Sequence, residues 1–317
     1  MEFLKKNSLP LAVMAGLGAA LMIPHIGMML KGWNLIVILT MLVFFFQGLG
    51  FDATGARKLN GWIKISLIGL ITSQLLAPVL GWAAVNLLGW QEDRYVGFLI
   101  ICCMAPTLVS GTVIATSAGG DRGVSLFLTI TLNLVSIVLI PLNLRWTLGS
   151  DVDMNQWFLL NKLAITVLLP GLAGHLFRKV VPRAANFRNL INYTPILCMG
   201  CIIFMSISSQ VDCLRQAEVM EIVAIILPAL LVHYLLFAFV WYSSRSTGLP
   251  YRVNTAISFV CSQKTLPVAI IVWQQMFAET YPMALIPPIV FHLGQIYGDG
   301  FLARWVEKRE GTGISTP

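Results

Sequence analysis

The sequence predicts an all-α, polytopic membrane protein, and its composition, its repeated apolar blocks and the charges between those blocks favour this fold class. Of 317 residues, 57% are hydrophobic and only 11% are charged, whereas a soluble domain carries about a quarter charged residues. Mean hydropathy is +0.80. The net charge of +7 lies in short segments between the blocks. A nucleic-acid-binding protein would instead gather that charge on one surface, so this class is excluded.

We expect ten transmembrane helices, each close to the roughly 20 residues that cross a bilayer. In chain order they cover residues 9–28, 33–51, 62–89, 95–118, 123–146, 156–178, 189–209, 219–243, 253–277 and 281–305. The first block follows Lys5 and Lys6 and continues through Ala19 and Ala20, so we interpret it as a span and not as a cleaved signal peptide.

The charges in the connecting segments separate consecutive spans and predict their orientation. With a cytoplasmic N-terminus, the cytoplasmic segments hold 15 of 21 basic residues: Lys5, Lys6, Arg57, Lys58, Lys64, Arg122, Arg178, Lys179, Arg183, Arg188, Arg245, Arg252, Arg304, Lys308 and Arg309. The opposite segments hold five, Lys31, Arg94, Arg145, Lys162 and Arg215, with the acidic Glu92, Asp93, Asp151, Asp153, Asp212, Glu218, Glu221 and Glu279. This bias predicts a multi-pass protein of the inner or plasma membrane with both termini cytoplasmic.

Lys264 belongs to neither side, because it lies inside the ninth span between the apolar runs 257–261 and 268–272. A cation at mid-membrane depth costs about 2.5–3.5 kcal/mol on insertion scales. Pro267 interrupts the backbone hydrogen bonds of the same segment. Irregular backbone at this depth must be buried in protein or line a wet cavity. The pattern therefore predicts a substrate or ion site near the midplane of a transporter.

Ten spans divide into two sets of five, and an odd number per set predicts a five-plus-five inverted repeat. The fourth span of the first set holds the segment 106–110, and the fourth of the second holds 264–268. Each pairs a proline with small hydroxyl residues. We therefore expect Ser110 and Thr112 to contribute to the site. Thr116, Ser117 and the Gly119–Gly120 pair are interpreted as close helix packing.

Catalytic and metal-binding motifs are missing from the sequence. It has no Gly-x-Ser-x-Gly, no His-Glu-x-x-His and no paired intramembrane aspartates, which argues against an enzyme. Cys198-x-x-Cys201 has no histidine at metal spacing, and we interpret all six cysteines as packing residues. No cofactor is expected.

Three stretches resemble the bile acid:sodium symporter family. The run Pro-Thr-Leu-Val-Ser-Gly-Thr followed by Gly-Gly-Asp, within residues 104–141, is similar to the fourth and fifth spans of that family. Residues 261–266 (Cys-Ser-Gln-Lys-Thr-Leu) are similar to the ninth span of its symporter-like branch, close to the type 7 sodium/bile acid cotransporters. Gln74-x-x-x-Pro78 resembles a third-span segment. The resemblance covers nearly the whole chain in span order.

The resemblance implies two domains. A core would hold residues 62–150 and 216–306 (spans 3–5 and 8–10), with broken helices 4 and 9 crossing at its centre. A panel would hold residues 1–61 and 151–215, and residues 307–317 would form a cytoplasmic tail. Substrate would bind between core and panel, which would move against each other in alternating access.

The resemblance also implies two sodium sites. The first would fall on Gly111, Thr112, Ser125, Thr129 and Phe259, and the second on Gln74, Phe259, Val260, Ser262 and Gln263. Gln74, Ser125, Thr129 and Gln263 keep oxygen groups suitable for sodium. Gly111 replaces a serine and Thr112 an asparagine. Phe259 stands where sodium-coupled members have a glutamate that serves both sites, and Lys264 stands where they have an asparagine.

These replacements suggest that Lys264 substitutes for bound sodium. Two sodium ions and one carboxylate sum to +1, and one lysine with no carboxylate nearby also gives +1. The hypothesis is that the ammonium donates to hydroxyls and carbonyls, such as those of Ser110, Thr112 and Thr129. Coupling to protons stays open, because a buried lysine can lose its proton. So do uncoupled transport and a purely structural lysine.

Other polar residues of the spans extend the candidate site. Thr265 follows Lys264 directly, and Asn133 lies one turn after Thr129. His292, Gln295 and Asp299 share one face of the tenth span. Asp299 could reach the inner interface, pair with Lys264 or relay a proton with His292. His233 is interpreted as a hydrogen-bonded interior residue.

The leading functional prediction is a secondary transporter of a small organic anion, bile-acid-like or another carboxylate or sulfate. Lys264 and the N-termini of broken helices favour anionic groups. The alternatives are a cation/proton antiporter, disfavoured because spans four and nine lack a carboxylate, and a membrane regulator without transport. The expected partners are the anion and the lipid bilayer. Oligomeric state, substrate identity and the coupling ion stay open.

Overall fold

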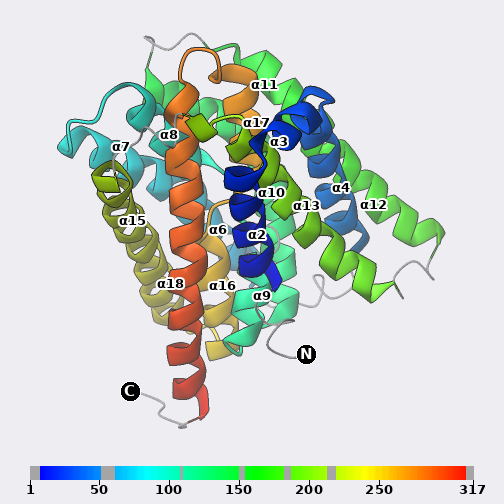
Figure 1. Cartoon of the computed structure of the whole chain (residues 1–317). Coiled ribbons are helices and arrows are strands. Elements are labelled where there is room, and N and C mark those ends of the chain that lie inside the picture. Colours follow the sequence, from blue (N-terminus) through cyan, green and yellow to red (C-terminus); the bar gives the residue numbers. More distant parts are fainter. Residues whose placement is uncertain are drawn as a thin grey trace.

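The computed structural model describes residues 8–50, 61–107, 110–149, 154–181, 187–212 and 219–311. Every regular element in these ranges is helical, which confirms the all-α class (Figure 1). The elements are α2 (Ser8–Met22), α3 (Pro24–Gly32), α4 (Leu35–Gly50), α6 (Trp62–Leu70), η1 (Ile71–Leu76), α7 (Ala77–Leu87), α8 (Glu92–Cys103), α9 (Ser110–Ser117), α10 (Arg122–Leu148), α11 (Gln156–Leu163), η2 (Ala164–Leu168), α12 (Leu169–Val180), α13 (Arg188–Ser208), α15 (Val219–Ser246), α16 (Tyr251–Ser262), α17 (Leu266–Met276), η4 (Pro282–Leu285) and α18 (Ile286–Gly311).

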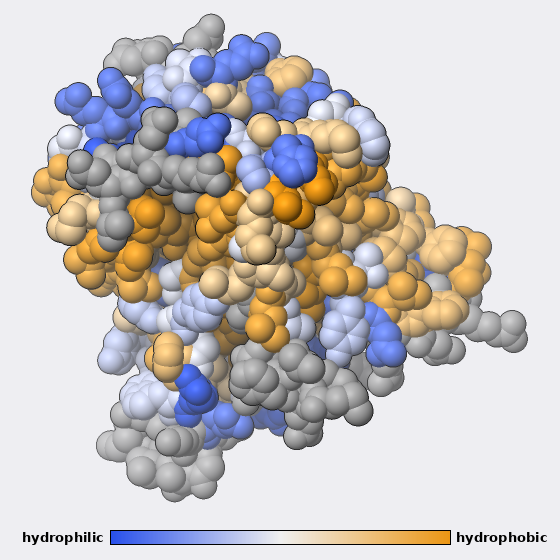
Figure 2. All heavy atoms as spheres, in the orientation of Figure 1, coloured by the Kyte–Doolittle hydropathy of each residue, from blue (hydrophilic) through white to orange (hydrophobic). Residues whose placement is uncertain are grey.

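Six helical stretches of the described chain are long and apolar enough to cross a membrane. They are Trp62–Leu87, Arg122–Leu148, Gln156–Val180, Asn189–Ser208, Ile222–Ser246 and Tyr251–Met276. The bent pair α2–α3 makes a seventh if it is one span. Figure 2 shows an apolar belt around the middle of the molecule, with hydrophilic residues toward both ends. The protein is therefore an integral, multi-pass membrane protein.

The predicted first span, 9–28, differs from the structure because two helices replace it. α2 and α3 meet at an angle of 103°. Pro24 begins α3, and a proline has no N–H to continue the hydrogen bonds of a preceding helix. The bend lays α3 across one end of the bundle (Figure 1).

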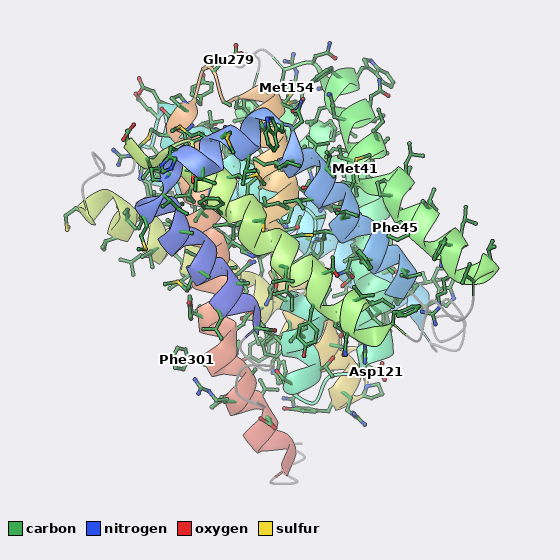
Figure 3. All side chains as sticks on the ribbon, turned by 45° about the vertical axis from the view of Figure 1, so that its right-hand side comes forward. Met41, Phe45, Asp121, Met154, Glu279 and Phe301 are labelled. Carbon is green, nitrogen blue, oxygen red and sulfur yellow. The ribbon has the colours of Figure 1, made fainter. Side chains whose placement is uncertain are left out.

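Several charged residues used to predict orientation lie outside the described residues: Lys5, Lys6, Arg57, Lys58, Asp151, Asp153, Arg183, Arg215 and Glu218. The two ends of the bundle are defined by residues within the described ranges. Met154 and Glu279 lie at the end that carries α3, called the distal end below. Asp121 lies at the opposite end (Figure 3).

The helices pack in two groups. The α13 group contains α2, α3, α4, η2, α12 and α13, and the α16 group contains the other elements except α11. α11 continues into η2 and also packs against α10 and α17 of the α16 group, and it is counted with the α13 group here. Glycines let backbones of the α13 group touch: a Cβ on Gly48 would collide with the Gly171 oxygen, and one on Gly174 would collide with the Phe45 oxygen. Such contacts drive helix association in membranes, where the hydrophobic effect between helices is weak.

Two of the predicted spans are interrupted at mid-length, as their prolines predict. After α8 the backbone is extended at Met104 and includes Pro106. Between α16 and α17 it is extended at Gln263 and Thr265, and Pro267 lies in the first turn of α17. Residues 254–273, which contain this second break, are all buried. Irregular backbone is thus surrounded by protein, as the membrane requires.

Candidate functional site

The two interrupted spans meet at their breaks. The Thr265 N–H donates to the Ala105 carbonyl over 3.0 Å. Nearby, a Cβ on Gly111 at the start of α9 would lie 3.4 Å from the Val260 Cα of α16. α9 therefore lies close to α16, and the breaks bond to each other directly.

The first break leaves three consecutive carbonyls without helical partners, and each accepts a bond from a different element. Met104 O accepts from the Lys264 Nζ at 3.0 Å and from the Gln74 Nε2 at 3.3 Å. Ala105 O accepts from Thr265. Pro106 O accepts from the Asn133 Nδ2 at 3.1 Å. Buried carbonyls need such partners, so these polar groups complete the broken backbone.

The second break is held by side chains of α18. Gln295 donates through Nε2 to the Lys264 carbonyl at 2.7 Å, and its Oε1 accepts from the Lys264 N–H at 2.9 Å. The His292 Nδ1 lies 3.1 Å from the same carbonyl. One glutamine amide therefore satisfies both backbone polar groups of Lys264, as a neighbouring strand would.

The Lys264 side chain is 0% exposed. Its ammonium donates to the Ser73 carbonyl at 2.5 Å and to Met104 O. Ser73 lies in η1, a π-helical stretch, and such irregular turns are frequent at functional sites. The ammonium is thus fixed between an irregular turn of one span and the end of α8.

The predicted hydroxyl partners of Lys264 are wrong. Ser110 Oγ donates to the Gln263 Oε1 at 2.8 Å, and the Thr112 and Thr129 hydroxyls contact each other at 3.4 Å. Both recorded acceptors of the ammonium are backbone carbonyls. Each of these carbonyls belongs to a peptide unit that carries a large dipole. Two such dipoles suit a cation that is buried away from water.

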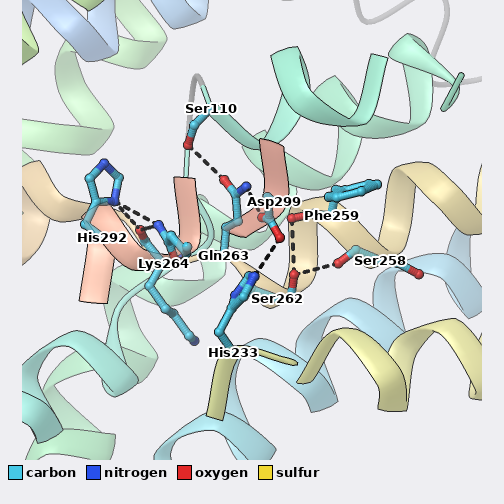
Figure 4. A network of polar contacts seen from close by, with 10 residues as sticks. Ser110, His233, Ser258, Phe259, Ser262, Gln263, Lys264, His292 and Asp299 are labelled. Atoms are coloured by element: carbon cyan, nitrogen blue, oxygen red, sulfur yellow. Dashed lines mark hydrogen bonds and ion pairs between the residues drawn. The ribbon is translucent and has the colours of Figure 1, made fainter. Parts of the chain in front are cut away.

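Gln263 links three elements in Figure 4. Its Oε1 accepts from Ser110, and its Nε2 donates to the Asp299 Oδ2 at 2.5 Å. Asp299 contacts His233 as well: the Oδ1 lies 2.7 Å from the His233 Nε2. His233 Nδ1 lies 3.2 Å from the Ser262 carbonyl. A continuous polar chain therefore runs from α9 through the break to α18, α15 and back to α16.

The position and partners of Asp299 differ from three expectations drawn from the sequence. It is fully buried and so does not reach the interface. Its recorded partners are His233 and Gln263, not Lys264 or His292. A carboxylate is therefore present beside the crossing, and the assumption that none lies nearby was wrong. It comes from α18, 40 positions after Phe259, and only the helix packing could reveal that.

Three of the residues carried over from the family offer no unpartnered side-chain oxygen to sodium. The Phe259 side chain has no oxygen and packs edge-on against Phe237 at 5.0 Å between ring centroids. Gln74 Oε1 accepts from the Asn143 Nδ2 at 3.3 Å, and Gln263 Oε1 accepts from Ser110. Hard cations need several free oxygens, usually with a carboxylate among them, and these oxygens already have protein partners.

The side chains of two predicted site residues stand apart from the network. The Ser125 hydroxyl donates to the Asp121 carbonyl in the first turn of α10. The Ser262 hydroxyl donates back to Ser258 O within α16, so only the Ser262 carbonyl joins the site. Lys264, Gln263, Thr265, Gln74, Ser110 and Asn133 meet around the breaks, and the Thr112–Thr129 pair joins them because Asn133 also donates to Thr129 O.

Asn143 and Ser73 were not predicted. Asn143 donates to both the Gln74 carbonyl and the Gln74 side chain. Its polar amide within an apolar span is a signal that sequence reasoning could have used. No comparable signal marks Ser73, because its role depends on a π-helical turn.

A buried cation fixed where two interrupted helices cross, within an apolar bundle, is the architecture of a membrane transporter and not of an enzyme. The chain belongs to the SBF-like CPA transporter family, whose model matches residues 7–308. This confirms the resemblance to the bile acid:sodium symporters.

Individual relatives extend over most of the chain. The probable sodium/metabolite cotransporter BASS4 of Arabidopsis thaliana chloroplasts is 30% identical, over 98% of this chain and 75% of the relative. The sodium/bile acid cotransporter 7 of Xenopus tropicalis is 22% identical, over 80% of this chain and 77% of its own length. The Rattus norvegicus protein of the same name is 20% identical over 100% and 98%. All three are named as cotransporters.

Proposed function

We propose that this protein is a secondary transporter of a small organic anion, bile-acid-like or another carboxylate or sulfate, in which the Lys264 ammonium replaces bound sodium. The observation that carries the proposal is a fully buried ammonium whose acceptors are the carbonyls of Ser73 and Met104. The names of the relatives support cotransport of a metabolite or bile acid. The net positive charge of Lys264 favours an anion as the substrate.

The transport cycle would be alternating access between a core and a panel in a ten-span inverted repeat. Two observations support this division. The α13 group matches the panel of spans 1, 2, 6 and 7, and the α16 group matches the core. The groups also meet at few places. One is the Lys31 ammonium of α3, which lies 5.2 Å from the centre of the Trp273 ring of α17. Core and panel would move apart by breaking such contacts.

Both termini would face the cytoplasm. The N-terminal end of α2 and the C-terminal end of α18 lie at the same end of the bundle (Figure 1). Asp121, adjacent to the basic Arg122, also lies away from the distal end (Figure 3). This arrangement agrees with the excess of basic residues assigned to that side.

The test is a ligand screen combined with flux. Purified protein is heated with organic anions, taurocholate first, in sodium or choline buffers, and uptake of stabilising anions into proteoliposomes follows. We expect at least one anion to raise the unfolding temperature equally in both buffers and to be transported. Stabilisation without flux would indicate a regulator, and accumulation driven by a sodium gradient would overturn the replacement of sodium by Lys264.

Asp299 gives a second candidate, a cation/proton antiporter, more support than the sequence did. Such antiporters need an intramembrane carboxylate, and Asp299 places one beside the crossing. The same proteoliposomes distinguish the two functions. An antiporter would exchange protons for an inorganic cation with no organic anion present.

A further inference from the structure

The buried pair His233–Asp299 has no role in the organic-anion transport proposed above. The two side chains come from α15 and α18, both are 0% exposed, and the Nε2 lies 2.7 Å from the Oδ1 (Figure 4). Buried charges are costly unless they are paired. The state of this pair therefore depends on how many protons it holds.

The hydrogen-bond partners of His233 indicate how many protons the pair holds. Its Nδ1 faces the Ser262 carbonyl, which can only accept, so Nδ1 carries a hydrogen. On the other side, a bare Nε2 and a carboxylate oxygen 2.7 Å apart would be two acceptors facing each other. A second proton must lie between them. The pair thus holds one proton more than a neutral imidazole and a carboxylate, and its net charge is zero.

Loss of that proton would break a contact at the crossing. If Nδ1 keeps its hydrogen, Nε2 and the Asp299 Oδ1 repel each other. If the remaining hydrogen moves to Nε2, the bond to the Ser262 carbonyl is lost. Ser262 directly precedes the break, and the other oxygen of Asp299 accepts from Gln263. Proton occupancy is therefore tied to the position of α16 relative to α15 and α18.

The charge of the core changes with the same proton. Lys264 contributes +1. With the shared proton in place, the crossing region carries +1 and favours an anion. Without it, Asp299 adds −1 and the sum is zero, so attraction for an anion falls. One proton thus restores the positive charge that a nearby carboxylate would otherwise cancel.

We propose that the His233–Asp299 pair is the proton-binding site of this transporter and that one proton is carried with each monovalent organic anion. On release, the shared N–H or O–H bond breaks, its electrons stay on the nitrogen or oxygen, and the proton passes to water. The anion part rests on the proposed function, whereas the proton site stands on the geometry of the pair alone.

The other titratable groups near the pair are few in the described chain. α15 contributes Tyr234, whose ring centre lies 5.2 Å from that of His233. α16 contributes Cys261, and α18 contributes His292, which is bonded to the Lys264 carbonyl. The Lys264 ammonium is directed to Ser73 and Met104. His292 belongs to the site, so His175 is the control histidine: it lies in α12, which packs against α4 and η2.

The experiment records currents from proteoliposomes on a solid-supported membrane after pH jumps, without any organic anion. We expect proton-binding currents from the intact protein and from His175→Gln, and none from Asp299→Asn or His233→Gln. The amide introduced by Asp299→Asn would donate to the His233 Nε2 and mimic the proton-loaded pair. No current from the intact protein, or unchanged currents in Asp299→Asn, would overturn the proposal.

Binding of taurocholate tests the coupling. Affinity should fall by up to about tenfold per pH unit once the pair has lost its proton, and it should be independent of pH in Asp299→Asn. The same pH dependence in both proteins would refute coupling through this pair. If the variants do not fold, an infrared pH titration of the intact protein with isotope-labelled aspartate and histidine decides whether the pair titrates. Proton currents without anion flux would refute the transport function and leave the proton site standing.

Discussion

Replacing Lys264 by alanine is expected to abolish flux and to destabilise the protein by about 3–5 kcal/mol. The substitution leaves the Ser73 carbonyl without the ammonium and opens a cavity where a fully buried side chain lay. An unpartnered buried polar group costs about 1–3 kcal/mol, and large-to-small core substitutions cost about 2–5 kcal/mol. Met104 O keeps its bond from Gln74. Thermal unfolding and flux of the purified variant measure both effects.

Two further variants separate the causes. Lys264→Met keeps most of the volume, so it should recover part of the stability but none of the flux. Lys64→Ala removes a lysine that also donates to a carbonyl, that of Thr247 at 2.8 Å, but on the exposed surface. Surface bonds of this kind contribute little, so the stability and the flux of Lys64→Ala should stay near those of the intact protein. Flux retained in Lys264→Ala would mean that the lysine is only structural.

Gln295→Leu is expected to cost about 2–4 kcal/mol, because one amide serves both backbone groups of Lys264. Leucine fills a similar volume but leaves a buried N–H without its acceptor and weakens the support of the carbonyl, at about 1–3 kcal/mol for each group. Flux should fall as well, since the break then no longer holds Lys264 in place. Gln295→Glu keeps an acceptor for the Lys264 N–H. Its stability and flux should therefore lie between those of the intact protein and those of Gln295→Leu.

Gln274 provides the matched control for this substitution. It lies in α17 of the same span, and its amide oxygen has no hydrogen-bond partner among the described residues. Gln274→Leu should therefore lower the unfolding temperature much less than Gln295→Leu. Equal decreases in unfolding temperature in the two variants would show that the two Gln295 bonds to the Lys264 backbone contribute no special stability.

The parts of the fold that depend on local chemistry could be predicted from the sequence. Apolar blocks predict helices, and Pro106 and Pro267 predict the two interruptions, because a proline cannot continue helical hydrogen bonds. A proline, Pro24, also marks the 103° bend between α2 and α3. It was missed because the apolar block on both sides of Pro24 is continuous.

The partners across the site could not be predicted, because they depend on helix rotation. The sequence placed Gln263 and Lys264 at the crossing but could not tell which carbonyls or carboxylates would face them. Asp299 reaches Gln263 only through the packing of α18. His233 was correctly interpreted as a hydrogen-bonded interior residue, yet its partner, Asp299, could not be identified. The π-helical turn that presents the Ser73 carbonyl leaves no mark in the composition.

The residues around the two breaks together determine the net charge of the crossing. Phe259 of α16 stands where the resemblance implies a glutamate, and Asp299 of α18 supplies a carboxylate with His233 as its partner. Lys264 then provides a cation that cannot leave, and the shared proton decides whether the region is positive or neutral. A fixed cation and a mobile proton would together replace two mobile sodium ions.

The most direct test of the replacement of sodium by Lys264 is equilibrium binding of radioactive sodium to the purified protein. No saturable binding is expected at any concentration up to that of a physiological external medium. The double variant Phe259→Glu, Lys264→Asn restores the two family residues and is expected to bind more sodium than the intact protein. Saturable, stoichiometric sodium binding by the intact protein would contradict the account.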